Sequence, residues 1–473
     1  MKTIFRLIDF ELFNVRNVTK GKINFLNEYS DQKVLNNSIL GLYGPNGSGK
    51  TASIDVLKLL SLLATENSIS AYAFDLVSFY KSVAKVKYNF LMLEDDVKYL
   101  ISYEISFKAD SLNNKAIILR EDLSSKVCKK DDKYTKYGNE ISIDYSSDTK
   151  ENILSSNVAT NNLYKKSLID LYAARAIAKD KNSSFIFGKE FLKLLKTTNK
   201  DNKLNYPEDY KIIYNFTDYL RMNFFVLSNK DYSFSNLGLL PLFGLVKNET
   251  LETIKGGCMS VDLVKPVTMS ETNYEVVKDS VKKINLIMPS FIPGYKLKVV
   301  EIDNKSTINN EKMVTFSFYS IVNDEIIPLR DESDGIKKII SICSALCGLF
   351  NDPSIFLAID EFDSGIFEYL FGELLNVIDE YSKGQLFFTS HNLRPLEVLN
   401  YKKIMFTTTN PNNRYIYFRA LTPTNNLRDS YLRAIQVGGQ KEEIYKETHD
   451  SDIVFSFKKA GLISKWLRQK KQS

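Results

Sequence analysis

Short runs of apolar residues, separated by polar and turn-forming clusters, predict strands along much of this chain. Three runs are apolar almost throughout, as is typical of strands buried on both faces of a parallel sheet. Shorter runs bounded by Asp, Asn and Ser predict an antiparallel sheet. An apolar N-terminal segment, 4–13, predicts one or two more strands. The buried runs are 39–43, 354–359 and 386–390, and the runs of the antiparallel sheet are 87–93, 98–107 and 116–120. Two further strands with alternating polarity are expected at 296–302 and 313–320.

Helical periodicity fills most of the remaining chain. It covers 52–63, 153–225, 273–286 and 339–350, and Pro289, Pro293 and Gly294 end the third of these segments. A stretch rich in Lys, Asp, Ser and Tyr, 124–148, predicts loops or a weak hairpin. We therefore predict an α/β fold with an appended antiparallel β-sheet. Its three segments are an N-terminal part of a head (1–125), a mostly α-helical insertion or lid (126–310), and a C-terminal part of the head with an extension (311–473).

Composition narrows the class of protein without deciding its function. The 473 residues include 44% hydrophobic and 25% charged residues, which is typical of a globular chain with a large core. The formal net charge of +6 permits nucleic acid as a partner but does not argue for it. The four cysteines show no zinc spacing, and no signal peptide or long apolar run is present. We expect a cytoplasmic protein without a membrane partner.

The strongest chemical signal is the segment GLYGPNGSGKT at 41–51, which fits the phosphate-loop pattern G-x-x-x-x-G-K-[ST]. A predicted strand precedes it and a predicted helix follows it, as the pattern requires. Glycines let the main chain approach a ligand closely, so N–H groups and the helix start can bind phosphate oxygens. Lys50 adds a cation, and Thr51 offers a hydroxyl to Mg²⁺. The predicted ATP-binding residues are Gly44, Pro45, Asn46, Gly47, Ser48, Gly49, Lys50, Thr51 and Ala52.

Two later strands end in residues that would complete an ATP site. The run 354–359 ends at Asp360 and Glu361, and the carboxyl end of such a strand meets the phosphate loop in this class of fold. We expect Asp360 to bind Mg²⁺ with Thr51, and Glu361 to act as the general base for water. The run 386–390 is followed by His391, one of two histidines. A histidine there could contact the γ-phosphate or only cap the strand.

The segment ESDGIKK at 332–338 supplies a fourth element, just ahead of a predicted helix. Ser333 and Gly335 at a helix start form a small anion site, although the same pattern also describes an ordinary N-cap. The complete order is phosphate loop, long insertion, S-x-G, Asp-Glu strand, an Asp363-Ser364-Gly365 turn and strand-end His391.

This order resembles the ABC/SMC/RecF-like head ATPases, over roughly residues 1–125 and 320–420. The resemblance implies an ABC-type P-loop ATPase head that pairs head to tail with a second copy. It implies that Ser333, Gly335 and Lys337 form the signature that acts in trans, that Asp363 lies in the D-loop at the dimer face, and that His391 is the switch histidine. The segment Asn14-Val15-Arg16-Asn17 is similar to the N-F-R-N element of RecF-like proteins, so Arg16 and Asn17 would line the base pocket. The signature reads ESDGIKK rather than LSGGQ, and no glutamine is placed for a Q-loop.

A closer resemblance is to stand-alone ABC-type ATPases of prokaryotic anti-phage defence, including those of abortive-infection system L and of PARIS. It rests on the stretches PLRDESDGIKKII, AIDEFDSGIFEYLFGELL and FFTSHNLRPLEVL. It implies a sensor that controls a separately encoded toxic effector, such as a Toprim-like nuclease, because only about 80 residues follow His391, fewer than a typical domain needs. A RecF/SMC-like ATPase acting on DNA in repair or recombination is the alternative, and a transporter subunit ranks last.

Overall fold

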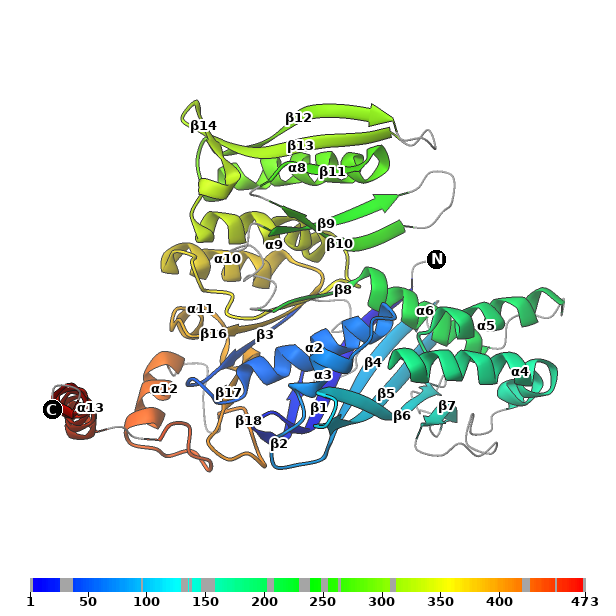
Figure 1. Cartoon of the computed structure of the whole chain (residues 1–473), viewed down its shortest axis with the longest axis horizontal. Coiled ribbons are helices and arrows are strands. Elements are labelled where there is room, and N and C mark those ends of the chain that lie inside the picture. Colours follow the sequence, from blue (N-terminus) through cyan, green and yellow to red (C-terminus); the bar gives the residue numbers. More distant parts are fainter. Residues whose placement is uncertain are drawn as a thin grey trace.

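The computed structural model describes residues 3–25, 37–94, 97–128, 135, 138–145, 158–201, 208–228, 239–247, 254–262, 265–306, 312–418, 426–446 and 449–470 (Figure 1). Four sheets and their helices are built from these residues. The segment predicted as an insertion, 126–310, is only partly included. Side chains are described for fewer residues still, and those of 461–470 in the last helix lie outside the description.

A six-stranded sheet carries the phosphate loop and both strand-end motifs. Its order is β18-β17-β3-β16-β15-β8, and every pair is parallel except β17 with β18. The strand that ends before His391 therefore lies between the phosphate-loop strand and the Asp-Glu strand. The strands are β3 (Ser38–Tyr43), β8 (Phe224–Leu227), β15 (Phe356–Ile359), β16 (Gln385–Ser390), β17 (Ile404–Thr407) and β18 (Tyr415–Ile416).

Both faces of this parallel sheet are buried, which explains why its strands are apolar throughout. Along β16, Phe387 packs into one hydrophobic core while Leu386 and Phe388 pack into another. Successive side chains point to opposite faces of a strand, so a strand covered on both sides needs apolar residues at every position. The predicted α/β fold class with a buried parallel sheet is confirmed.

The first core lies between this sheet and a six-stranded antiparallel sheet of order β2-β1-β4-β5-β6-β7. Helix α2 (Lys50–Ala64) packs between the two sheets, and its residues Ile54, Leu57 and Leu60 are fully buried. The antiparallel strands are β1 (Ile4–Val15), β2 (Val18–Asn24), β4 (Val83–Glu94), β5 (Val97–Asp110), β6 (Lys115–Val127) and β7 (Gly138–Asp144). Helices α3 (Ser70–Phe74), α4 (Val158–Lys181), α5 (Lys189–Asp201) and α6 (Glu208–Met222) accompany them.

The second core lies on the opposite face of the parallel sheet (Figure 1). Helices α9 (Asp334–Asn351) and α10 (Glu368–Tyr381) cover that face. Helix α8 (Glu271–Phe291) separates α9 from a small antiparallel sheet at the top of Figure 1. That sheet contains β11 (Val267–Ser270), β12 (Lys296–Ser306), β13 (Lys312–Val322) and β14 (Glu325–Pro328), and a hairpin of β9 (Leu239–Lys247) and β10 (Ile254–Asp262) lies against α8 and α9.

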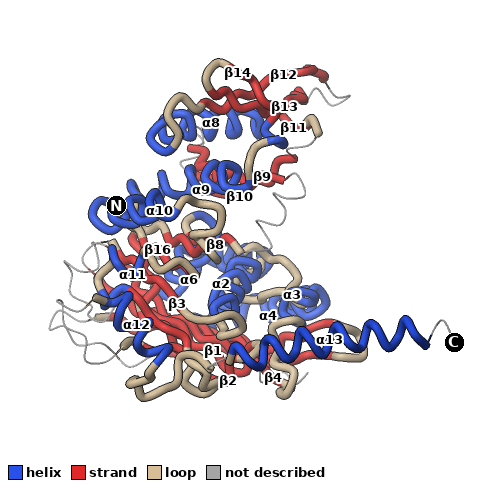
Figure 2. Tube along the Cα trace, turned by 90° about the vertical axis from the view of Figure 1, so that its left-hand side faces the viewer, coloured by secondary structure: helices blue, strands red, loops and turns tan. Residues whose placement is uncertain are grey.

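The C-terminal elements finish the head and then leave it. Short helical elements follow β16: α11 (Pro395–Val398), η3 (Tyr401–Lys403) and α12 (Leu427–Gln436). A further short turn, η2 (Leu329–Asp331), lies earlier in the chain, just before α9. Helix α13 (Asp450–Lys470) then extends away from the rest of the chain (Figure 2). Within the part of the chain that the structure describes, every helix is too short or too polar to span a lipid bilayer.

Two segments differ from the sequence prediction. Helical periodicity was expected to continue to 225, but α6 ends at Met222 and Phe224–Leu227 form β8, which pairs with β15. A buried four-residue apolar run satisfies either pattern, and only its partner strand decides between them. The segment 126–310 thus contributes a strand to the central sheet, and its boundaries remain a prediction. Helix α8 also passes through Pro289 and ends at Phe291.

Candidate functional site

The phosphate loop is a main-chain cradle between β3 and α2. Gly49 caps the helix in a left-handed conformation, with φ of 94°. A side chain at Gly44 has no room, because a Cβ there would lie 1.6 Å from the Thr407 hydroxyl oxygen. Glycine at these two positions therefore allows both the turn and the close contact. The N-terminus of the 15-residue helix α2 provides free N–H groups and a positive dipole end at the loop.

Lys50 is folded back into its own loop. Its ammonium donates hydrogen bonds to the carbonyl oxygens of Gly44, at 2.7 Å, and Pro45, at 3.0 Å, and the side chain is buried. Burial lowers the pKa of Lys50 to about 8, and the nearby carboxylates of Asp360, Glu361 and Asp363 oppose that shift. The ammonium is thus charged at neutral pH and is held by neutral carbonyl groups that an anionic ligand would replace.

The loop is braced by C-terminal residues that the sequence did not single out. Tyr415 on β18 donates its hydroxyl hydrogen to the Gly49 carbonyl at 2.8 Å, and Thr407 at the end of β17 donates to the Ser48 hydroxyl at 2.7 Å. Arg414 donates to the carbonyl of Asn17 at 2.7 Å. These contacts span more than 350 residues of sequence, so no local pattern could have indicated them.

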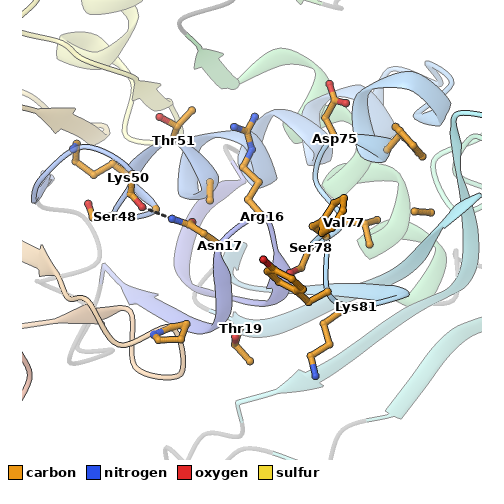
Figure 3. Close-up of a pocket in the computed structure, with 18 of the residues that line it drawn as sticks. Arg16, Asn17, Thr19, Ser48, Lys50, Thr51, Asp75, Val77, Ser78 and Lys81 are labelled. Atoms are coloured by element: carbon orange, nitrogen blue, oxygen red, sulfur yellow. Dashed lines mark hydrogen bonds between the residues drawn. The ribbon is translucent and has the colours of Figure 1, made fainter. Parts of the chain in front are cut away.

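Arg16 and Asn17 lie beside the loop. The Asn17 amide donates to the Gly47 carbonyl (Figure 3), and Arg16 forms an ion pair with Asp55 on α2 at 2.5 Å. Arg16 itself has a positive φ of 50°, and its main-chain N–H donates to the Leu76 carbonyl. The turn after β1 is thereby tied to both the phosphate loop and the helix that follows it.

A pocket of about 1220 Å³ opens over these groups. Its lining contains most of the predicted site: Arg16, Asn17, Asn46, Gly47, Ser48, Gly49, Lys50, Thr51, Ala52, Glu361 and His391. It continues past Arg16 to a segment at 74–82 and to Ala109 and Ser111 (Figure 3). Typical small-molecule pockets measure about 300–1,000 Å³, so a nucleotide with bound Mg²⁺ would fit here with room to spare.

Asp360 and Glu361 follow β15 and share one partner on the neighbouring strand. The Thr389 hydroxyl donates to Asp360 Oδ1 at 2.6 Å and accepts the main-chain N–H of Glu361 at 2.7 Å. Asp360 is almost fully buried, and that burial raises its pKa to about 6 despite the Thr389 hydrogen bond. Thr389 was not predicted. Its signal is the register of β15 against β16, which pairs Ile359 with Phe388 and so brings the next residues together.

Asp360 and Thr51 fit the Mg²⁺ site that the sequence predicts. Asp360 Oδ2 is buried and has no hydrogen-bond partner among the described residues, and the hydroxyl-bearing Thr51 lines the pocket. Carboxylate and hydroxyl oxygens are the ligands that Mg²⁺ takes in proteins, usually together with phosphate and water. A bound Mg²⁺ would neutralise phosphate charge at this position.

Asp363 and His391 are joined to each other. The Asp363 carboxylate accepts the main-chain N–H groups of His391, at 3.2 Å, and of Asn392, at 3.0 Å. The imidazole of His391 is exposed at the pocket, where partial burial and then the Lys50 charge lower its pKa. Asp363 therefore fixes the chain after β16 within its own subunit, and a further role at a dimer face stays a prediction.

The S-x-G segment begins α9 and lies outside the pocket of its own chain. Ser333 is exposed and caps the helix by accepting the N–H of Ile336 at 3.3 Å. Gly335 touches the turn after Asp363, because a Cβ there would meet the Gly365 carbonyl oxygen at 2.1 Å. Lys337 is buried, with its ammonium 3.7 Å from Asp334. None of Ser333, Gly335 and Lys337 is part of the pocket lining.

Comparison with known proteins finds partial matches. A family model described as "AAA domain, putative AbiEii toxin, Type IV TA system" matches residues 276–397. The matched segment is about a quarter of the chain. It spans Ser333, Asp360, Glu361 and His391 but does not include the phosphate loop. No curated protein matches the sequence.

Several solved head domains are similar in structure at low sequence identity. One is an Smc head domain from Pyrococcus furiosus bound to the C-terminal domain of ScpA, with 10% identity, a TM-score of 0.38, and coverage of 92% of this chain and 99% of that chain. Another is the recombination mediator RecF with ATP, with 14% identity, a TM-score of 0.34, and coverage of 82% of this chain and 94% of that chain. The SMC head domain from Thermotoga maritima has 13% identity and a TM-score of 0.30, and the match covers 88% of this chain and 100% of that chain.

Proposed function

We propose that this protein binds ATP with Mg²⁺ in the pocket over the phosphate loop and hydrolyses it. One observation carries the proposal: the loop with Lys50 lines the same pocket as Glu361 and His391. The buried Asp360 directly follows β15 and precedes Glu361 in the chain. A phosphate-loop lysine, a buried metal-binding acid and a second acid at one pocket are the groups that phosphoryl transfer to water requires.

Each residue has a distinct role in the proposed reaction. The main-chain N–H groups of the loop and the Lys50 ammonium bind the β- and γ-phosphates, while Thr51 and Asp360 hold Mg²⁺. Glu361 orients the attacking water and accepts its proton. His391 has a lowered pKa, so its neutral imidazole can hydrogen-bond the γ-phosphate at neutral pH. Arg16 and Asn17 contact the outer part of the nucleotide, where the pocket continues beyond the loop.

The site is proposed to be completed by a second copy of the chain. Ser333 is exposed at the start of α9 and does not line the pocket of its own chain, so its side chain is available to another molecule. In a head-to-tail dimer, Ser333, Gly335 and Lys337 of one copy would cover the γ-phosphate bound to the other. ATP would then hold two heads together, and hydrolysis would let them separate.

Nucleotide binding is tested by titrating ATP and MgCl₂ into the protein in a calorimeter. Lys50→Ala should lose measurable affinity, because it removes the ammonium that faces the phosphates. Lys58→Ala is the matched control, since Lys58 lies on the same helix but not in the pocket. Equal ATP affinity for Lys50→Ala and Lys58→Ala would overturn the assignment of the site.

At the biological level, we propose that the ATPase senses infection and controls a separately encoded toxic effector. The description of the matching family, which names a toxin of a toxin–antitoxin system, supports this role. A Toprim-like nuclease is the effector class that the sequence resemblance implies. The contact surface would lie on the segment 126–310 or on the C-terminal extension.

Phage plating tests the role in defence. Protection should require the adjacent effector gene and should be lost with Glu361→Gln. Full protection by this gene alone in a host without the effector would contradict the proposal. Sensitivity to DNA damage on deletion, with no change in phage plating, would instead favour a RecF/SMC-like ATPase that acts on DNA in repair or recombination.

A further inference from the structure

The proposed catalytic base has an unusual main-chain conformation. Glu361 has a φ of 47°. This lies in the left-handed region, which residues other than glycine, asparagine and aspartate seldom adopt. Such a conformation is strained and persists only where surrounding contacts hold it. Three contacts hold the peptide groups of Glu361, and one of them is the N–H of Ser364, which donates to the Glu361 carbonyl at 3.0 Å within the turn. The N–H of Glu361 donates to the Thr389 hydroxyl at 2.7 Å, and its carbonyl oxygen also accepts the ammonium of Lys338.

Lys338 reaches this carbonyl from a separate element. It lies on α9, five residues after Ser333, and its side chain is buried against the turn that follows β15. Burial lowers the pKa of Lys338 to about 8, and the charges of Asp363, Glu361 and Asp360 oppose that shift. A charged donor to a carbonyl makes a stronger hydrogen bond than a neutral one.

The same turn is fixed at its other residues. The N–H of Phe362 donates to the Thr389 carbonyl at 2.9 Å, and Gly335 of α9 lies against Gly365. The peptide bond between Glu361 and Phe362 is therefore held by β16 on its N–H side, and on its carbonyl side by the Ser364 N–H of the same turn and by Lys338 from α9. Its orientation sets φ at Phe362 and ψ at Glu361, and so the direction in which the Glu361 carboxylate leaves the main chain.

We propose that Lys338 is a positioning residue for Glu361. By holding the carbonyl of Glu361, it keeps the left-handed turn and directs the carboxylate into the nucleotide pocket. This inference rests on the proposed ATPase function, in which Glu361 orients water. Lys338 itself does not line the pocket, so it acts through Glu361 and not on the nucleotide.

The test compares Lys338→Met with Lys58→Met. Lys58 makes the same kind of contact, from its ammonium to the Val226 carbonyl at 3.5 Å, on a helix of the same head. Methionine keeps the length of either side chain and removes the donor. A displacement of about 1 Å can cost about 10²-fold in rate, so we expect Lys338→Met to lower kcat by about 10–10²-fold. Its ATP affinity should stay within about threefold, because binding groups are untouched.

Two further variants separate positioning from a general structural effect. Lys338→Arg keeps a charged donor and should recover a large part of the rate lost in Lys338→Met. In a Glu361→Gln background, Lys338→Met should lower kcat by less than a further factor of about three. The effects of two residues on kcat do not add when both act through one group. Melting temperatures of all variants show whether each is folded.

Three outcomes would overturn the inference. The first is equal kcat for Lys338→Met and Lys58→Met. The second is the same fold loss on Lys338→Met with and without Glu361→Gln, which would mean that Lys338 acts independently of the base. The third is a folded Lys338→Arg that is no faster than Lys338→Met. If wild type and Lys58→Met both fail to hydrolyse ATP, the proposed function fails, and this inference fails with it.

Discussion

Replacing Thr389 with valine should damage both stability and catalysis, although the two side chains have nearly the same shape. Thr389 is fully buried at the end of β16. Valine would fill the same space and is favoured in strands, so packing is preserved. What is lost is the hydroxyl, which donates to Asp360 and accepts the N–H of Glu361. The perturbation therefore removes one hydrogen-bonding atom shared by two proposed site residues.

The size of the effect follows from these two contacts. Losing a hydrogen bond to a charged group costs about 1.5–3 kcal/mol, and leaving a buried N–H without a partner costs about 1–3 kcal/mol. We therefore expect the free energy of unfolding to fall by about 3–5 kcal/mol and Tm to fall by several degrees. The kcat for ATP should also fall, because the main-chain contact that holds Glu361 on its N–H side is gone. The pKa of Asp360 should rise further, since Thr389 opposes its upward shift.

Thr217→Val provides the control for this prediction. Thr217 is also fully buried, but its hydroxyl donates at 2.8 Å to the Ile213 carbonyl one turn earlier in α6. That carbonyl keeps its helical main-chain partner when the hydroxyl is removed. Thr217→Val should therefore lower the free energy of unfolding by less than about 1.5 kcal/mol and leave kcat unchanged. The reasoning is refuted if thermal melts and ATPase assays show no difference between Thr389→Val and Thr217→Val.

Two further predictions address the dimer and pH. Ser333→Arg should block ATP-dependent association and turnover. Mixing it with Lys50→Ala should restore part of the activity, because a mixed dimer holds one intact composite site. No recovery, with mixed dimers shown by co-purification of differently tagged chains, would argue against action in trans. Burial raises the pKa of Glu121 from 4.5 to about 7, so the folded state binds an extra proton between those values and loses about 3 kcal/mol of stability as pH rises through them. Glu121→Gln should remove this part of the slope, and identical Tm-against-pH curves for the variant and wild type between pH 5 and 8 would contradict it.

Contiguous motifs could be predicted from the sequence because their chemistry is local. The phosphate loop needs its glycines, Lys50 and Thr51 within a few residues, between a strand and a helix, and the structure has β3 and α2 there. Asp360 and His391 could be placed because both follow apolar runs that become parallel strands of one sheet. Parallel strands bring their carboxyl ends to one edge, so strand-end residues meet without further information.

Residues that act through distant contacts could not be predicted in this way. Thr389 was part of an apolar run, and its role depends on the register between β15 and β16. Lys338 looked like one of two adjacent lysines at a helix start, and only the packing of α9 on the turn after β15 identifies its carbonyl partner. Phe224 and Phe225, the first half of β8, were read as the end of a helical segment because a buried four-residue run fits either element until its neighbour strand is known.

The most direct test of the central claim is the rate of ATP hydrolysis by wild type and by Glu361→Gln. Glutamine keeps the size of the side chain and removes the base. The account predicts ATP affinity close to that of wild type, a kcat lower by about 10²–10⁴-fold, and dimers that persist with ATP and Mg²⁺ in light scattering. Turnover by Glu361→Gln at the wild-type rate would contradict the account and place the catalytic base elsewhere.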